Sequence, residues 1–176
     1  MYTLDYYLFI VKSLNELYTI GHSNHDLEKF LKLLHDNQVQ LLVDVRSSPY
    51  SRYVPHFNRE NLKDSLKKCN VDYIFLGDKI GGKPKDQSYY TEGKVNFNLI
   101  AQSAPYKEGI LQFMELSSQT SSALLCSEED PYQCHRHNLI TSTLLEKGVE
   151  VNHIRGNGKV EKITRISKKD VQTKLF

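Results

Sequence analysis

The sequence contains no apolar run long enough to cross a membrane and no low-complexity segment. Its longest apolar stretch, residues 6–11, is far shorter than the roughly 20 residues that a membrane-spanning helix needs. Asp5 stands where a secretory signal would carry positive charge, and no small-residue cleavage pattern follows. We therefore expect a soluble, cytoplasmic protein with no membrane partner.

Cysteine is scarce, and its spacing is not that of a disulfide framework. Cys69, Cys126 and Cys134 are odd in number, so we expect reduced thiols. Cys126 and Cys134 are too far apart for a Cys-x-x-Cys redox pair or a standard zinc knuckle. We assign no metal ligands from the sequence, although a three-ligand site of both cysteines and one histidine remains an alternative.

Other signatures of site chemistry are also missing. Gly81-Gly82 lacks the Gly-x-Gly-x-x-Gly fingerprint of dinucleotide binding, so the sequence indicates no cofactor. Both halves of the zinc-deaminase signature are absent. The reactive loops of cysteine phosphatases and many rhodanese-like proteins need an arginine six positions after the cysteine. Tyr132 and Ile140 occupy those positions here.

Positive charge is concentrated at the C-terminus. The formal net charge is +2, but residues 157–176 hold six Lys/Arg against two Asp/Glu. The rest of the chain therefore has 17 Lys/Arg against 19 Asp/Glu, a net of −2. A basic segment can contact nucleic acid phosphates, and a solvated terminus is the alternative interpretation.

Apolar periodicity predicts one α/β domain in which strands alternate with helices. Strands are expected at residues 18–20, 40–46, 71–76, 123–126 and 149–154, and helices at 27–34, 59–68, 106–116 and 133–146. The alternation implies a mostly parallel sheet of about five strands with helices on both faces, in Rossmann/flavodoxin-like layering. We divide the chain into an N-terminal extension (1–17), the α/β domain (18–156) and a basic C-terminal segment (157–176). Residues 77–96 are expected to form a long irregular loop, either a lid or a surface insertion.

Polar residues follow four of the predicted strands. They are Gly21-His22-Ser23, Asp44-Val45-Arg46-Ser47, Gly77, and the stretch from Cys126 to Arg136. The carboxyl ends of parallel strands meet at one edge of a sheet, where ligands bind at a topological switch point. We therefore expect these residues to share one crevice.

The expected reactive residues are His22, Asp44, Glu128 and Cys134. A carboxylate at a strand end can gain proton affinity through partial burial, and it can equally cap a helix or pair with an arginine. Cys134 in the first turn of a helix would favour the thiolate, or it packs as a small apolar residue. His135 is not expected to be its base, because adjacent helical side chains point about 100° apart. His22 or His153 would then be needed.

The arginines indicate an anionic ligand, because a guanidinium group binds phosphate or carboxylate through two hydrogen bonds. The expected ligand-binding residues are Ser23, Arg46, Ser47, Arg52, His135 and Arg136. In the alternative interpretation, Arg46 or Arg136 pairs internally with Asp44, Glu128 or Asp130 and fixes the loops.

Three separated motifs also carry a family resemblance. They are Thr19-Ile20-Gly21-His22-Ser23-Asn24, then Val43-Asp44-Val45-Arg46-Ser47 with Pro49, Ser51 and Arg52, and finally Leu125-Cys126 with Glu128 and Cys134-His135-Arg136. With these motifs the chain resembles domain-of-unknown-function family 488, an uncharacterised bacterial and archaeal family, over roughly residues 18–156. Ser127 departs from the small Ala that the family more often shows. The resemblance strengthens the predicted site and leaves its reaction open.

These observations favour an enzyme, a hydrolase or group transferase, that acts on an anionic small molecule, nucleotide-like, or on a nucleic acid. The alternative is a non-catalytic module that binds nucleotides or nucleic acid. Lesser alternatives are a thiol-dependent, rhodanese-like enzyme and a metal-dependent enzyme. The sequence does not separate enzyme from binding module and does not indicate an oligomeric state.

Overall fold

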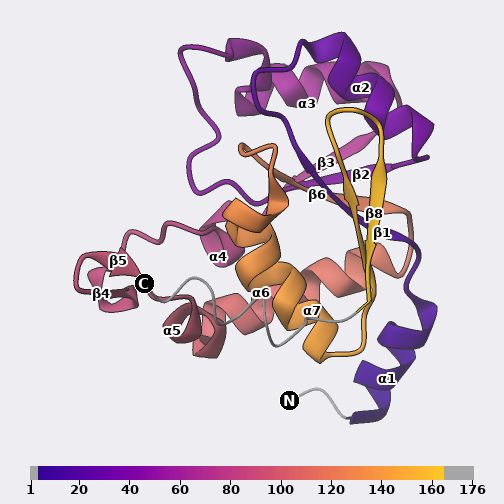
Figure 1. Cartoon of the computed structure of the whole chain (residues 1–176). Coiled ribbons are helices and arrows are strands. Elements are labelled where there is room, and N and C mark those ends of the chain that lie inside the picture. The colour runs from indigo at the N-terminus through magenta and orange to yellow at the C-terminus, as the bar shows by residue number, and fades with distance from the viewer. Residues whose placement is uncertain (1–3, 165–176) are drawn as a thin grey trace.

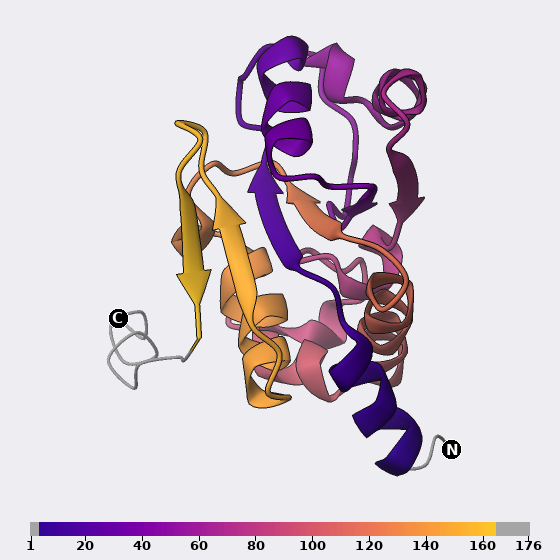
Figure 2. The ribbon, with the colours of Figure 1, turned by 90° about the vertical axis from the view of Figure 1, so that its right-hand side faces the viewer.

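The fold is built on a six-stranded sheet in the order β3-β2-β6-β1-β7-β8. It is seen in a computed structural model that describes residues 4–164. Five strands are parallel, namely β1 (Leu17–Gly21), β2 (Leu41–Asp44), β3 (Asp72–Phe75), β6 (Ser122–Cys126) and β7 (Val151–Ile154). The edge strand β8 (Val160–Ile163) runs antiparallel to β7 (Figure 2). The predicted α/β fold with a mostly parallel sheet is confirmed.

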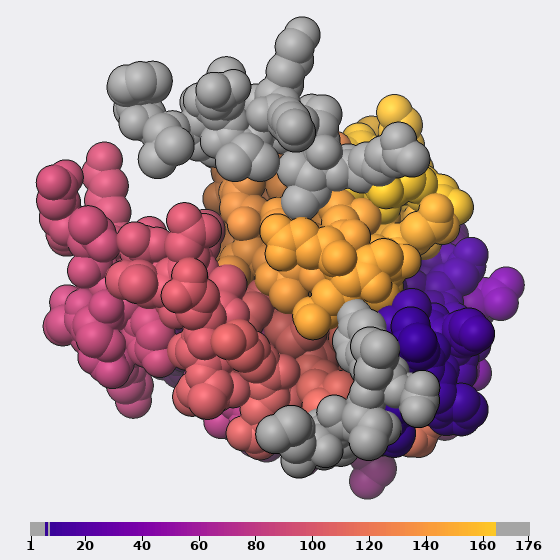
Figure 3. Space-filling view, turned by 90° about the horizontal axis from the view of Figure 1, so that it is seen from below, coloured from indigo at the N-terminus to yellow at the C-terminus, as the bar shows by residue number. Residues whose placement is uncertain are grey.

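Helices cover both faces of the sheet (Figure 1). One face carries α2 (Leu27–Asp36) and α3 (Arg59–Lys68), which pack on it through Phe30 and Leu62 among others. The other face carries α1 (Leu4–Ser13), α4 (Gly77–Ile80), α5 (Phe97–Gln102), α6 (Ala104–Ser117) and α7 (Ser142–Glu146). Seen from below, the segments of α1, α6 and α7 share one surface (Figure 3). Among residues 4–164, no helix combines the length and apolar character needed to cross a bilayer.

The central strands are apolar throughout because both of their faces are covered, as is usual for parallel sheets. Successive side chains alternate between the faces. Leu42 belongs to the core on the α2/α3 side, whereas Val43 and Leu124 belong to the core on the α6/α7 side. By the same alternation, Asp44 at the end of β2 faces the α2/α3 side, and Cys126 at the end of β6 faces the α6/α7 side.

Local interactions fix the ends of α2. Asp26 caps α2 by accepting a hydrogen bond from Lys29 N–H at 2.7 Å, and Asn37 ends that helix. The prediction that residues 77–96 form an irregular loop was wrong in part, because this segment contains α4 and a hairpin of β4 (Tyr90–Thr91) and β5 (Lys94–Val95). Glu92 and Gly93, both with positive φ, make the tight hairpin turn.

The two terminal segments also contain regular structure. Ile10 of α1 is buried in the core, although the sequence marks no element in residues 1–17. Strand β8 lies in the basic C-terminal segment, and residues 165–176 of that segment lie outside the described residues.

The predicted helix at 133–146 is interrupted. A 3₁₀ turn at Pro131–Gln133 is followed by Cys134 in an extended conformation, with φ −124° and ψ 148°. A π-helix at Arg136–Thr141 then continues into α7. Gly148, with φ +78°, follows α7 and allows the chain to turn away at the end of that helix. The break at Cys134 determines the geometry of the candidate site.

Candidate functional site

The turns after β1, β2 and β6 are joined at the carboxyl edge of the sheet. β6 lies between β2 and β1. His22 N–H donates to the Cys126 carbonyl at 3.0 Å, and Val45 N–H donates to the Leu125 carbonyl at 3.1 Å. From β2 the chain continues to β3 on one side of the sheet, whereas from β6 it continues to β7 on the other side. The carboxyl ends of β2 and β6 therefore flank a topological switch point, where open α/β sheets bind ligands.

On the α2/α3 side, Asp44, Arg46 and His22 form a buried network. Arg46 donates to both carboxylate oxygens of Asp44, from Nε at 2.9 Å and from Nη2 at 2.6 Å. The Tyr73 hydroxyl also donates to Asp44, at 2.7 Å. Arg46 Nη1 lies 3.1 Å from His22 Nε2, and the His22 ring stacks on Phe57. The internal pairing considered for Arg46 is therefore present, and it occupies much of the guanidinium group.

Burial and the charge of Arg46 lower the pKa of His22 to about 4. The imidazole is therefore neutral near pH 7. Its Nδ1 lies 2.7 Å from the Ser23 carbonyl, which can only accept, so Nδ1 carries the proton and Nε2 accepts from Arg46. Burial and the Asp44 carboxylate raise the pKa of Tyr73, which keeps its hydroxyl as a donor. This network fixes the two turns, and neither His22 nor Tyr73 within it titrates near neutrality.

On the α6/α7 side, two thiols, a carboxylate and an imidazole form a second cluster. Cys126 Sγ lies 2.8 Å and Cys134 Sγ 3.3 Å from the same oxygen, Glu128 Oε2. His135 Nδ1 lies 3.6 Å from Cys126 Sγ and 3.7 Å from Cys134 Sγ. Both cysteines are buried, whereas Glu128 is exposed and His135 partly exposed. We call Cys126, Glu128, Cys134 and His135 the thiol cluster.

The thiol cluster has a strongly asymmetric charge distribution. A hydrogen bond from Cys126 lowers the pKa of Cys134 to about 5, with His135 and Arg136 adding to the effect against the cost of burial. The adjacent Cys134 sulfur, burial and the Glu128 carboxylate raise the pKa of Cys126. Burial raises the pKa of Glu128, but hydrogen bonds from both thiols outweigh it and lower the pKa overall. Two sulfur groups, of which Cys134 is the more acidic, and a carboxylate therefore meet here, as in nucleophilic or metal-binding sites.

His135 lies closer to Cys134 than the sequence predicts. The prediction assumed that both residues are helical, and this was wrong. Cys134 is extended, so its side chain turns back toward the imidazole. The Cys134 sulfur also accepts from Arg136 N–H at 3.4 Å, at the start of the π-helix. His153 instead contacts Thr19 at 2.8 Å and His137 at 2.9 Å.

Arg136 holds the loop that carries Glu128. Its side chain is 0% exposed, and its Nη1 and Nη2 donate to the backbone carbonyls of Glu128 and Glu129, the latter at 2.6 Å. A Cβ at position 21 would overlap the Glu128 carbonyl oxygen and lie 3.0 Å from Arg136 Nη1. Gly21 therefore lets this loop approach β1, and Arg136 clamps it there.

The remaining predicted ligand residues are placed differently. Ser47 Oγ accepts from Lys83 N–H at 2.9 Å, and Ser23 adopts a positive φ of 47°. Arg52 is exposed, and its Nη2 donates to the Tyr53 hydroxyl at 2.6 Å. Of the three predicted arginines, Arg52 alone presents its side chain to solvent.

A groove of about 570 Å³ opens beside the thiol cluster. It is lined by Ser47, Phe75, Lys79, Lys83 and Lys85 among others, at the carboxyl ends of β2 and β3. Gly82 separates it from the cluster, because a Cβ there would lie 2.5 Å from Cγ of the His135 ring. The close approach of Gly82 was not predicted, although the Gly81-Gly82 pair was its visible signal.

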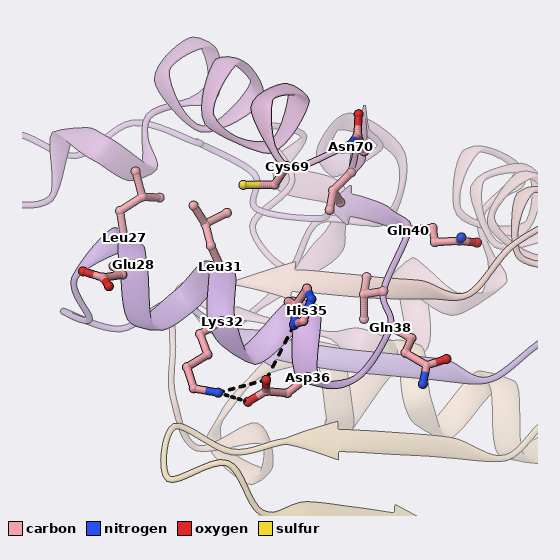
Figure 4. Close-up of a pocket in the computed structure, with 12 residues that line it drawn as sticks. Leu27, Glu28, Leu31, Lys32, His35, Asp36, Gln38, Gln40, Cys69 and Asn70 are labelled. Carbon is pink, nitrogen blue, oxygen red and sulfur yellow. Dashed lines mark hydrogen bonds and ion pairs between the residues drawn. The ribbon is translucent and has the colours of Figure 1, made fainter.

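A larger groove, of about 1140 Å³, lies away from this chemistry (Figure 4). It runs between α2 and the segment from Cys69 to Val71, with Leu27 and Leu31 in its lining. Its Lys32 and Asp36 pair with each other at 2.7 Å. The groove holds no residue of the thiol cluster, so size does not make it the candidate site.

Comparison with known proteins identifies a family and no activity. The family described as "Domain of unknown function DUF488" matches residues 26–142, two thirds of the chain. The match includes β2 and the whole thiol cluster. No curated protein and no solved structure matches the chain.

Proposed function

We propose a function for this chain, which belongs to the family of domains of unknown function DUF488. It is a hydrolase or group transferase that acts on an anionic, nucleotide-like or nucleic acid ligand at the carboxyl edge of the sheet. The observation that carries the proposal is the position of the thiol cluster, which only Gly82 separates from the groove lined by Lys83 and Lys85.

The thiol cluster supplies the reactive groups. Glu128 contacts both sulfurs and is open to solvent, so it can exchange protons with a bound substrate or with water. Asp44 and His22 have structural roles in this proposal, because Asp44 is saturated by Arg46 and Tyr73. The chemistry is therefore assigned to the cluster side of the edge.

The groove supplies positive charge for an anion. Lys79 Nζ is engaged by Glu108 at 2.6 Å. Lys83 and Lys85 are exposed and form no ion pair within residues 4–164. Cations that line a groove raise the local concentration of phosphate-bearing ligands and strengthen their binding. These two lysines replace Arg46 and Arg136 as the proposed anion contacts.

The loop after β2 adds a surface suited to nucleobases. Tyr50 and Tyr53 are 74% and 78% exposed, and the Arg52 guanidinium lies over the Tyr53 ring, 4.8 Å from its centre. Aromatic rings and arginines stack on bases of any sequence. A nucleotide or single-stranded nucleic acid therefore fits this edge better than a small inorganic anion.

The experiment compares turnover and binding with nucleoside phosphates and short single-stranded oligonucleotides. We expect product release by the wild type, and a loss on the order of 10²-fold in kcat for Glu128→Gln with binding retained. Lys83→Ala/Lys85→Ala should weaken binding, and added salt should reduce the difference.

Lys67→Ala/Lys68→Ala is the matched control, because it removes the same charge from an exposed pair at the far end of α3. It should bind and turn over as the wild type does. Binding that responds to the Lys83/Lys85 change without any turnover would favour the non-catalytic module. Absence of both binding and turnover would reject the proposal.

A further inference from the structure

The thiol cluster contains three donor atoms that converge on one point. Cys126 Sγ, Cys134 Sγ and His135 Nδ1 all lie within 4.8 Å of one another. They come from the end of β6 and from the two residues before the π-helix, which the 3₁₀ turn at Pro131–Gln133 brings together. Loop geometry, not sequence spacing, makes the cluster.

Each thiol has one proton but two acceptors within reach, Glu128 Oε2 and His135 Nδ1, so hydrogen bonding alone does not explain the convergence. A tetrahedral zinc site does. Bonds of about 2.3 Å to sulfur and 2.0–2.1 Å to nitrogen place the two atoms about 3.5–3.6 Å apart at tetrahedral angles. The sulfur-to-Nδ1 distances are 3.6 and 3.7 Å.

The His135 ring is oriented as a metal ligand. Its Nε2 donates to the Val45 carbonyl at 3.1 Å, which fixes the proton on Nε2 and leaves the Nδ1 lone pair facing the two sulfurs. A backbone carbonyl on the far nitrogen is the usual partner of a metal-bound histidine. Gly82 packs against the other side of this ring, where a Cβ would not fit.

We propose that Cys126, Cys134 and His135 bind one zinc ion, with Glu128 beside the open fourth position. Both sulfurs bind zinc as thiolates, so any proton that they carry passes to solvent as the sulfur–zinc bonds form. Two thiolates and an imidazole favour zinc over magnesium or calcium, which prefer oxygen ligands. Three protein ligands leave room for water or substrate, which is the arrangement of catalytic zinc sites. Glu128 Oε2, next to both sulfurs, is placed to act on that fourth ligand.

The test measures zinc binding to the reduced full-length chain, without any substrate. Mass spectrometry of the purified protein should find about one zinc per chain, and cobalt(II) should give thiolate charge-transfer absorption. Cys126→Ser, Cys134→Ser and His135→Ala should each lower zinc affinity at least tenfold, whereas Glu128→Gln should retain the ion. Cys69→Ser is the matched control, because Cys69 is an exposed cysteine outside the cluster.

Failure of the wild type to bind zinc, or an equal loss in Cys69→Ser, would overturn the proposal. Loss of zinc in Glu128→Gln would overturn the three-ligand assignment.

If the cysteine variants do not fold, alkylation of the wild-type protein tests the zinc site instead. Zinc should protect Cys126 and Cys134 from iodoacetamide while Cys69 reacts, and a chelator should remove the protection. Labelling that is unchanged by zinc would count against the site. Because no substrate is involved, these outcomes are independent of the proposed enzymatic activity.

Discussion

Arg46 forms a two-point ion pair with Asp44, which lies only two residues before it in the chain, with Nη2 2.6 Å from Oδ2. Side chains two residues apart at a strand end lie on the same face, so the pair forms without any long loop. The Asp44 side chain is 0% exposed and that of Arg46 5%. The pair also reaches His22, so it ties the turns after β2 and β1 together.

Asp44→Asn should destabilise the protein strongly, because it leaves the Arg46 charge buried without its partner. Removing one member of a buried pair typically costs about 3–5 kcal/mol of unfolding free energy. Urea denaturation measures this. Asp36→Asn is the control, because Asp36 pairs with Lys32 at the surface and should shift the midpoint little. Similar midpoints for both variants would mean that the buried pair does not hold the turns.

Gly82→Ala should disturb the thiol cluster from outside it. The added methyl group would lie 2.5 Å from the His135 ring, so the imidazole must shift from its position beside the two sulfurs. We expect zinc affinity to fall about tenfold or more. In Gly93→Ala the Cβ meets nothing within 4 Å, and only the positive φ of 75° is strained. That control should lose some stability and keep the affinity of the wild type; equal affinities in the two variants would contradict the role of Gly82.

The sequence predicts where the site lies because that part depends on local pattern. The apolar run from Leu41 to Val43 reads as a strand covered on both faces, and Asp44 and Arg46 follow it directly. A parallel sheet then brings such ends to one edge. This argument needs no knowledge of side-chain contacts, and the sheet has the predicted mostly parallel form.

The contacts within the site could not be predicted in the same way. Cys134 reads as part of a helix, because the apolar spacing of Leu139 and Ile140 extends back to it. The extended conformation at Cys134 comes from the turn at Asp130-Pro131, whose Asp130 side chain accepts from Tyr132 N–H at 3.1 Å. The Tyr73 bond to Asp44 joins two strands, so its partner is fixed only by strand register.

The unfolding free energy should fall as pH is lowered from about 6.5 to 4. Burial, with the Arg46 charge, lowers the pKa of His22 to about 4, and burial lowers the pKa of His153 to about 3. An unfolded histidine titrates near pH 6.5, so in this range the unfolded chain binds more protons and is favoured. Above about pH 6.5 both states are neutral at these residues and their contribution is constant.

The size of this effect follows from the shift of each group. For His22, about 3 kcal/mol of unfolding free energy should be lost between neutral pH and pH 4. His22→Gln should flatten the dependence measured by urea denaturation at several pH values. His35→Gln is the control, because the His35 side chain is 90% exposed. If the unfolding free energy of His22→Gln depends on pH as strongly as that of the wild type, His22 takes up its proton in the folded state as readily as in the unfolded chain.

Arg136→Lys should loosen the thiol cluster although it keeps the positive charge. Two guanidinium nitrogens hold the carbonyls of Glu128 and Glu129, and an ammonium group cannot reproduce this fork. We expect a loss of about 2–4 kcal/mol in unfolding free energy, together with weaker zinc binding. Arg59→Lys is the control, since the Arg59 side chain is 48% exposed and should tolerate the change. If both variants unfold at the same urea concentration and bind zinc equally, the backbone near Glu128 keeps its position without the Arg136 guanidinium group. The rigidity of the thiol cluster must then come from Gly21 and the Pro131–Gln133 turn.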